Sequence, residues 1–96
     1  MRVYYVYILT NYYNTIFYVG VTNNLRRRVG EHKDKFGSDS FAKKYNINKL
    51  VYFEEFLYIN DAIAAEKRLK HWKQKWKREL IEYDNKDYLD LSDDWE

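Results

Sequence analysis

The 96-residue sequence predicts an α+β fold in which a three-stranded, mainly antiparallel sheet is flanked by helices. Two short segments rich in tyrosine and β-branched residues lie on either side of a turn. A third apolar segment lies in the middle of the chain, and basic helical patterns follow the second and third segments. No proline and only three glycines interrupt these patterns. We expect a single domain, residues 1–96, with its core at about 3–81.

The first two strands are expected to form a hairpin. Residues 4–9 and 16–20 carry the aromatic and β-branched side chains that favour strands, and the asparagine-rich residues 11–14 between them are typical of a turn. Facing strands of a hairpin bring their side chains close together. We therefore expect Tyr7 and Tyr18 to be near neighbours.

A helix is expected after the hairpin. Residues 22–24 (Thr-Asn-Asn) can cap it, and Leu25, Val29 and Phe36 recur at helical spacing along its apolar stripe. Residues 35–48 mix small, polar and aromatic side chains, which predicts a loop with a short helical turn.

The third strand is expected at residues 50–58. Its apolar residues Val51, Phe53 and Leu57 alternate well enough to line one face, although Phe56 breaks the alternation. This segment would complete the sheet.

Two helices and an acidic tail are expected in the remaining sequence. Asn60 and Asp61 supply a cap and a first-turn acid for a helix at residues 62–72, and a second helical pattern runs from about 73 to 83. Without proline or glycine at their junction, the sequence leaves open whether the second helix continues the first. Residues 84–96 are acidic but carry apolar side chains that can pack this tail onto the domain.

Composition excludes several classes of protein. The chain has no cysteine, which excludes disulfides and thiolate metal sites. It has no apolar stretch typical of a signal peptide, and no segment approaches the roughly 20 apolar residues of a membrane span. We expect a cytoplasmic protein without a membrane partner.

Positive charge is concentrated in two segments. Residues 23–49 hold eight Lys or Arg against three Asp or Glu, and residues 66–79 hold seven against two. Residues 80–96 hold one against seven. Two basic segments indicate a polyanionic partner. The alternative interpretation is that these cations only solvate two helices.

Arg28 is the basic residue nearest the buried stripe of its expected helix. It lies three residues after Leu25, whereas Arg26 and Arg27 point more toward solvent. A guanidinium is always protonated and can hold two phosphate oxygens in its planar fork. Arg28 is therefore suited to stabilise charge on a phosphoryl group.

Glu66 lies on the apolar stripe of its helix, four residues after Ala62. A carboxylate in that position is costly unless it is paired or bound to a metal. Two interpretations are open: a ligand to a divalent cation, or a structural ion pair with Arg28 or a lysine. Glu54 and Glu55 are weaker alternative ligands.

The tyrosine and arginine spacing resembles a known nuclease family. Residues 5–7 read Tyr-Val-Tyr, residues 18–20 read Tyr-Val-Gly, and Arg28 follows on the expected helix. This arrangement resembles the GIY-YIG nuclease superfamily over roughly residues 3–81, in a short stand-alone branch of small endonucleases. The first motif has Tyr-Val where the family has Gly-Ile. The resemblance implies the same α+β architecture.

The resemblance also implies catalytic roles. Arg28 would stabilise phosphate charge, Tyr7 or Tyr18 would act as general base or orient the attacking water, with Tyr7 preferred, and His32 would assist proton transfer. Because a free phenol has a pKa of about 10, a nearby cation would have to lower it. For His32 a plain structural hydrogen bond is the alternative.

A metal ligand and a supporting asparagine follow from the same resemblance. Glu66 would ligate one divalent cation, Mg²⁺ or Mn²⁺, with water and substrate phosphate as further ligands. Larger members of the family carry a late asparagine that supports the site, and Asn85 is the nearest candidate.

The implied partner is nucleic acid, with DNA the first choice, and a partner protein could supply targeting. The residues expected to contact nucleic acid are Arg26, Arg27, Lys33, Lys43, Lys44, Lys67, Arg68 and Lys70.

Together these features predict a metal-dependent endonuclease with a preference for DNA structure or damage, as in repair or recombination. One alternative is a nucleic-acid-binding module with a degenerate nuclease site. The other is an interaction protein whose basic helices dock an acidic protein surface or its own acidic tail.

Overall fold

The computed structural model describes residues 2–33 and 44–95 and confirms the α+β prediction. The strands are β1 (Tyr4–Thr10), β2 (Phe17–Thr22) and β3 (Lys49–Phe56). The helices are α1 (Leu25–Lys33), α3 (Ile59–His71) and α4 (Gln74–Asp84). Phe36 and Lys43, named above, lie outside the described residues. In the part of the chain that is described, no helix has the length and apolar character to cross a membrane.

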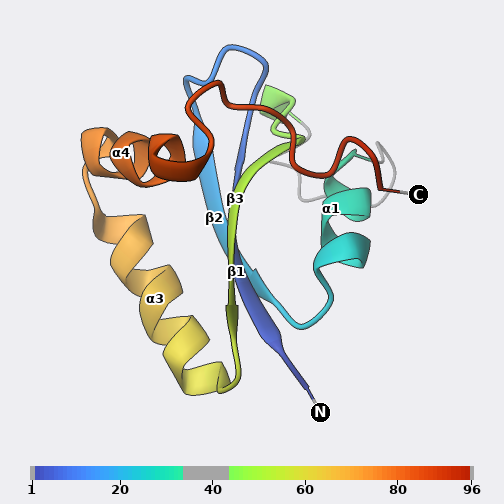
Figure 1. The fold of residues 1–96 in the computed structure, drawn as a ribbon, viewed down its shortest axis with the longest axis vertical. Helices are drawn as coiled ribbons and strands as arrows, with labels where there is room; N and C mark the ends of the chain where they lie inside the picture. The colour runs from blue at the N-terminus through green and yellow to red at the C-terminus, as the bar shows by residue number, and fades with distance from the viewer. Residues whose placement is uncertain (1, 34–43, 96) are drawn as a thin grey trace.

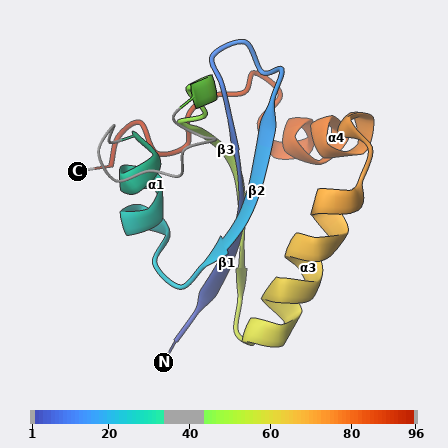
Figure 2. The same cartoon turned by 180° about the vertical axis from the view of Figure 1, so that it is seen from behind.

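The sheet has the order β2-β1-β3, and both strand pairs are antiparallel. Figures 1 and 2 show it nearly edge-on, with α1 against one face and with α3 and α4 on the other. The central strand β1 is therefore covered from both sides. Its side chains alternate between two separate apolar clusters.

The two clusters divide the core by face. On the α3 side, Val6 and Ile8 pack with residues of β2, β3 and both C-terminal helices. On the α1 side, Tyr7 and Leu9 pack with apolar residues of α1 and β3. Because neighbouring residues of a strand point to opposite faces, one tyrosine of β1 is directed to the α1 side while its neighbours build the other cluster.

The first hairpin forms as predicted. Tyr7 lies opposite Gly20 and Leu9 lies opposite Tyr18. The Asn11 carboxamide closes the turn by accepting a hydrogen bond from the backbone N–H of Thr15 at 2.9 Å. The predicted proximity of the two tyrosines follows from this register.

Strand β3 differs from its prediction because it contains a bulge. The register with β1 shifts between Ile8, which faces Tyr52, and Leu9, which faces Leu50. The extra residue in β3 ends the simple alternation, so Val51 joins the α3-side cluster while Phe53 lies opposite Tyr7 on the α1 side. The expectation that Val51, Phe53 and Leu57 share one face was therefore wrong. Leu57 lies beyond the strand and is exposed.

Helices α3 and α4 are separate. Trp72 and Lys73 both have extended backbone angles, which ends α3 and begins α4 without a glycine or proline. The start of α3 also differs from prediction, because Tyr58 rather than Asn60 occupies the N-cap position. The extended backbone of Tyr58 leads directly into the first turn, so Asn60 lies inside the helix.

The acidic tail packs down. In Figure 1 it runs from α4 across one end of the sheet to the α1 side. The Leu91 backbone N–H donates to the Leu50 carbonyl at 2.7 Å, and the Asn85 amide donates to the Val51 and Leu89 carbonyls. The tail thus becomes part of the fold and reaches the helix that carries Arg28.

Candidate functional site

The two motif tyrosines meet on the α1 face of the sheet. The ring centroids of Tyr7 and Tyr18 are 6.4 Å apart. Tyr7 is 1% exposed, and its phenol lies over Gly20. A Cβ atom at position 20 would overlap both the Tyr7 hydroxyl and the ring carbon that carries it. The glycine of the second motif therefore makes room for the tyrosine of the first.

His32 joins the tyrosine pair. Its ring centroid lies 5.0 Å from that of Tyr18 and 6.2 Å from that of Tyr7, and its side chain is buried. The residue is on α1 four positions after Arg28, so both project from the same helical face. Two phenols and an imidazole are thus in contact under α1.

Helix α1 begins at a defined cap, which fixes the direction of its side chains. The Asn24 carboxamide accepts from the Arg27 backbone N–H at 3.1 Å, and the Thr22 hydroxyl accepts from the Asn24 backbone N–H at 3.1 Å. These residues were predicted to cap the helix, and the structure confirms it. The cap sets the rotation of α1 and so turns Arg28 toward the sheet.

The Arg28 guanidinium lies close enough to the Tyr7 hydroxyl to lower its pKa. Its side chain is 38% exposed, whereas that of Arg27 is 60% exposed. The Arg28 Nε lies 3.2 Å from a Glu31 carboxylate oxygen, which is an ion-pair distance. As predicted, Arg28 is the arginine at the edge of the buried stripe. Its guanidinium connects the buried phenol to solvent.

The pKa of Tyr7 moves in the direction opposite to that required by its predicted role. Burial raises it well above the ordinary 10.0, and Tyr18 and Glu66 raise it further, while Arg28 lowers it through charge and a hydrogen bond. Desolvation outweighs the guanidinium. Burial thus favours the neutral form of the Tyr7 phenol.

Glu66 reaches the same region from α3. Its charge is felt by the Tyr7 phenol, and its side chain is only 16% exposed. The carboxylate lies 3.4 Å from the Lys70 ammonium, one turn further along the helix. The structure therefore contains the lysine ion pair that was one of the two interpretations. Since Lys70 is 53% exposed, it can move away from Glu66 at little cost.

The donor atoms at this site fit a hard divalent cation. Within residues 2–33 and 44–95, no three His, Cys, Asp or Glu residues cluster as a metal site. Glu66 offers one carboxylate, and Mg²⁺ is commonly held by one or two carboxylates together with water and substrate phosphate. Glu54 forms a 2.9 Å hydrogen bond with the Tyr52 hydroxyl instead.

Several cations predicted to contact nucleic acid have partners inside the chain. The Lys33 ammonium lies 2.6 Å from the Asp90 carboxylate, and the Arg26 guanidinium lies 5.1 Å from the centroid of the Trp95 ring. Lys44, Lys67 and Arg68 are exposed. One of the alternatives was that a basic helix docks the acidic tail of the same chain. The ion pair between Lys33 of α1 and Asp90 of the tail is one such contact.

Asn85 has a structural role. Its Oδ1 accepts from the Leu89 backbone N–H at 2.9 Å, and its Nδ2 donates to two backbone carbonyls. Its amide is fully used in holding the tail against β3. Among the hydrogen bonds of the described residues, none joins Asn85 to Tyr7, Tyr18 or Arg28.

Sequence reasoning missed Glu31 and Asp90. Glu31 lies three residues after Arg28 on α1, a spacing that places them side by side and could have indicated the pair. Asp90 accepts from Lys33, from the Leu50 N–H and from Ser92, and the Asp-x-Ser pattern was its only local signal. Its pairing with a residue 57 positions away depends on the folded tail.

Comparison with known proteins agrees with this geometry. A family model described as the GIY-YIG catalytic domain matches residues 3–79. A UPF0213 protein of Limosilactobacillus reuteri (strain DSM 20016) is 38% identical over 79 residues, which cover 81% of this chain and 81% of that protein. The solution NMR structure of a UPF0213 protein from Bacillus halodurans has the same fold, with a TM-score of 0.55 and 24% identity over 96% of this chain and 97% of that one. The family match spans both tyrosine motifs, Arg28 and Glu66, and the chain belongs to the GIY-YIG nuclease family.

Proposed function

We propose that this protein is an endonuclease that hydrolyses phosphodiester bonds in DNA, with a preference for particular structures or damage. One observation carries the proposal. The guanidinium of Arg28 lies close to a phenol that is packed against a second phenol and an imidazole, and a shielded carboxylate is within electrostatic range. These are the groups that phosphodiester hydrolysis requires.

Arg28 is the phosphate-binding group in this proposal. The Glu31 carboxylate lies 3.2 Å from the Arg28 Nε and the Tyr7 hydroxyl lies nearby, which favours one orientation of the guanidinium before substrate arrives. A preorganised donor of this kind stabilises charge that develops on the phosphoryl oxygens without a reorganisation cost at the moment of reaction. Because the side chain is partly exposed, a phosphate can reach it.

The two tyrosines have different roles in this proposal. Tyr7 is almost fully buried and neutral, which favours it as the group that positions Arg28. Tyr18 is only half-buried and is in ring contact with His32. We therefore assign the contact with the attacking water to Tyr18, and assign His32 to the transfer of its proton.

Glu66 would hold the divalent cation. GIY-YIG nucleases generally use such ions, and here we propose Mg²⁺ or Mn²⁺. When bound, the cation would supply positive charge that offsets the phosphate and lowers the pKa of groups close to it. For this to occur, Glu66 must exchange its contact with Lys70 for the cation.

A nucleic-acid-binding module without catalysis is the rival function. It would keep the basic surfaces and the fold but would not need the buried contact between Arg28 and Tyr7. The protein-interaction alternative predicts that an acidic polypeptide competes with DNA for the same surface. Neither alternative predicts a metal-dependent cleavage rate that falls when Arg28 is replaced, so that rate separates both alternatives from a nuclease.

The test is cleavage of labelled linear, flapped, branched and single-stranded DNA, with and without Mg²⁺ or Mn²⁺. Parent protein should cut at least one substrate only when the cation is present. Arg28→Ala should lower the rate by roughly a hundred- to a thousandfold, because one preorganised donor is worth about 2.7–4 kcal/mol in the transition state.

Arg27→Ala is the matched control. Arg27 is the preceding residue and lies 3.9 Å from the same Glu31 carboxylate, but it is directed to solvent. Its removal should change the rate less than threefold. Equal losses from the two substitutions would contradict the assignment of Arg28, and metal-independent binding without any product would favour the rival function.

A further inference from the structure

The corner between α3 and α4 has an exposed aromatic groove that the candidate site does not use. The groove has a volume of about 420 Å³ and is lined by Trp72, Trp76, Glu79, Leu80 and Tyr83. Trp76 is 47% exposed and Tyr83 is 87% exposed. Large rings left this open to solvent on a small domain indicate a contact surface for a ligand.

The groove is built on helix geometry. Trp76, Leu80 and Tyr83 follow one another at helical spacing on a single face of α4, and Trp72 ends α3 directly beside them. The Trp72 and Trp76 rings are 6.1 Å apart and nearly perpendicular. Leu80 and Trp72 pack against the core, so the floor is fixed while the outer rings remain accessible.

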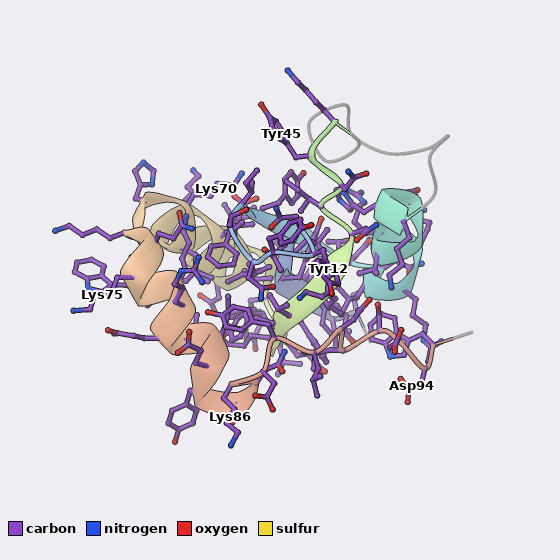
Figure 3. The ribbon with its side chains drawn as sticks, turned by 90° about the horizontal axis from the view of Figure 1, so that it is seen from above. Tyr12, Tyr45, Lys70, Lys75, Lys86 and Asp94 are labelled. Carbon is purple, nitrogen blue, oxygen red and sulfur yellow. The ribbon has the colours of Figure 1, made fainter. Side chains whose placement is uncertain are left out.

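The charge around the groove selects a polyanion. Residues 67–78 contain seven Lys or Arg and no Asp or Glu. The Lys73 ammonium lies 5.8 Å from the centroid of the Trp76 ring, and Figure 3 shows Lys75 on the outer side of α4. Glu79 is the one acid among the lining residues, so phosphates would lie on the lysine side and rings would enter the groove.

We propose that this groove binds the unpaired bases of a nucleic acid, with Trp76 and Tyr83 as stacking rings and Lys73 and Lys75 as phosphate contacts. Aromatic side chains next to cations are the means by which proteins bind single strands without reading their sequence, because every base has a π face. A duplex buries those faces and cannot offer them. An acidic peptide would match the charge but not the exposed rings.

The groove is connected to the candidate nuclease site through α3. Glu66 and Trp72 are six residues apart on one continuous helical path, which corresponds to about 9 Å along the axis. The inference rests on the proposed function in this respect: cleavage should occur within a few nucleotides of the bases held in the groove.

The test is binding by fluorescence anisotropy, in chelator and without divalent cation so that nothing is cut. The probes are a labelled oligothymidylate, a duplex of the same length and a poly-glutamate peptide. Trp76→Ala and Tyr83→Ala should each weaken single-strand binding by roughly 5- to 100-fold and leave duplex binding within about twofold. Intrinsic tryptophan fluorescence of the parent should be quenched by the oligothymidylate.

Tyr58→Ala is the matched control. Tyr58 is also strongly exposed but lies at the opposite end of α3, and its removal should not change single-strand binding. Tyr83→Ala removes a ring that is almost wholly in solvent, so its fold should be intact, as thermal unfolding will show. Trp76→Phe retains a stacking ring and should recover most of the affinity.

Several results would overturn the inference. Equal losses with duplex and single strand would mean that only phosphates are bound, and poly-glutamate binding that depends on Trp76 would assign the groove to a protein partner. If the parent cuts DNA but Trp76→Ala binds and cuts like the parent, the groove assignment fails while the proposed function stands. If no DNA is cut and Trp76-dependent single-strand binding persists, the proposed function fails and the groove assignment stands.

Discussion

The two basic regions have similar charge in the sequence but differ in what their cations contact. Every cation of α1 has a partner within the chain. These contacts are Arg26 with Trp95, Arg27 and Arg28 with Glu31, and Lys33 with Asp90. In the α3–α4 region, Lys70 pairs with Glu66 and Lys73 lies over the Trp76 ring, whereas Lys67 and Lys75 form no ion pair with any residue that the structure describes. Similar charge counts therefore correspond to different contacts.

This difference in contacts indicates that the cations of α1 are positioned for chemistry and that those of the α3–α4 region are available to bind a polyanion. Side chains of α1 are held by internal contacts, which suits groups that must be oriented before substrate arrives. Lys67, Lys73 and Lys75 of the α3–α4 region are exposed, which suits salt-dependent attraction to a polyanion. We infer that the α1 side performs the chemistry and that the α3–α4 side supplies much of the affinity.

Among the tests of this comparison, the largest effect on the cleavage rate is expected for Glu66→Gln. Cleavage should fall below detection, while binding without metal should survive because the lysines of the α3–α4 region are unchanged. Stability should change by less than about 1 kcal/mol, since the contact with Lys70 is a partly exposed pair within one helix.

Thermal unfolding with and without Mn²⁺ measures how much the cation stabilises the parent and the Glu66→Gln variant. The cation at a hundred times its dissociation constant should stabilise the parent by about 2.7 kcal/mol and should not stabilise Glu66→Gln. A metal-independent loss of several kcal/mol in the variant would show that Glu66 is a structural partner and not a ligand.

Gly20→Ala should damage the α1 side without touching the lysines. The added methyl group must displace the buried Tyr7 phenol, which should cost roughly 1–3 kcal/mol and lower the cleavage rate by misplacing Arg28. Gly30→Ala is the control, because a Cβ at that position of α1 meets nothing within 4 Å. It should stabilise the helix by up to about 1 kcal/mol. Chemical denaturation of both variants decides the matter.

Asp90→Asn tests the contact between the tail and α1. Burial alone would raise the pKa of Asp90, but hydrogen bonds from Lys33 and Ser92 outweigh it and hold the pKa below 3.8. The stabilisation is therefore present above about pH 4 and is lost as the pH falls through the folded-state pKa. Because Lys33 is partly exposed, we expect a loss of only about 1–2 kcal/mol at pH 7.

The pH dependence supplies the control for Asp90→Asn. The difference in unfolding free energy between parent and variant should shrink as the pH is lowered below 4. Asp87→Asn, at an exposed position of the same tail, should show no such difference. A difference that stays constant down to pH 2 would argue that the charge of Asp90 is not what holds the tail.

The smallest effect is expected in the salt dependence of binding. Replacing Lys73 and Lys75 by glutamine should reduce the slope of log K against log salt by about 0.7 per lysine for a single strand. Replacing Lys33 instead should leave the slope nearly unchanged, because its ammonium is paired with Asp90 within the chain. A larger change in slope from the α1 replacement than from the Lys73 and Lys75 replacements would assign nucleic-acid binding to α1.

Local patterns explain which parts of the structure could be predicted from the sequence. The hairpin, the cap at Asn24 and the position of Arg28 depend on neighbours within a few residues, and each was predicted. The α+β class followed from the same periodicities. The closeness of Tyr7 and Tyr18 needed only the hairpin register.

The features that the sequence did not predict depend on contacts between distant segments. The bulge at Val51 moved Phe53 to the other face, which no alternation count could reveal. Burial of Tyr7 under α1 outweighs the nearby arginine and raises the pKa of the phenol, a balance that the sequence could not show. The pairing of Lys33 with Asp90 requires the folded tail.

The most direct test of this division of function is a paired measurement of single-turnover cleavage rate and dissociation constant on one DNA substrate. Arg28→Ala should lower the rate at saturation by roughly a hundred- to a thousandfold with affinity within about twofold of the parent. The Lys73 and Lys75 double replacement should weaken affinity and leave the saturated rate unchanged. If Arg28→Ala instead lowers rate and affinity in parallel, Arg28 is an ordinary phosphate contact and the account of the α1 side is wrong.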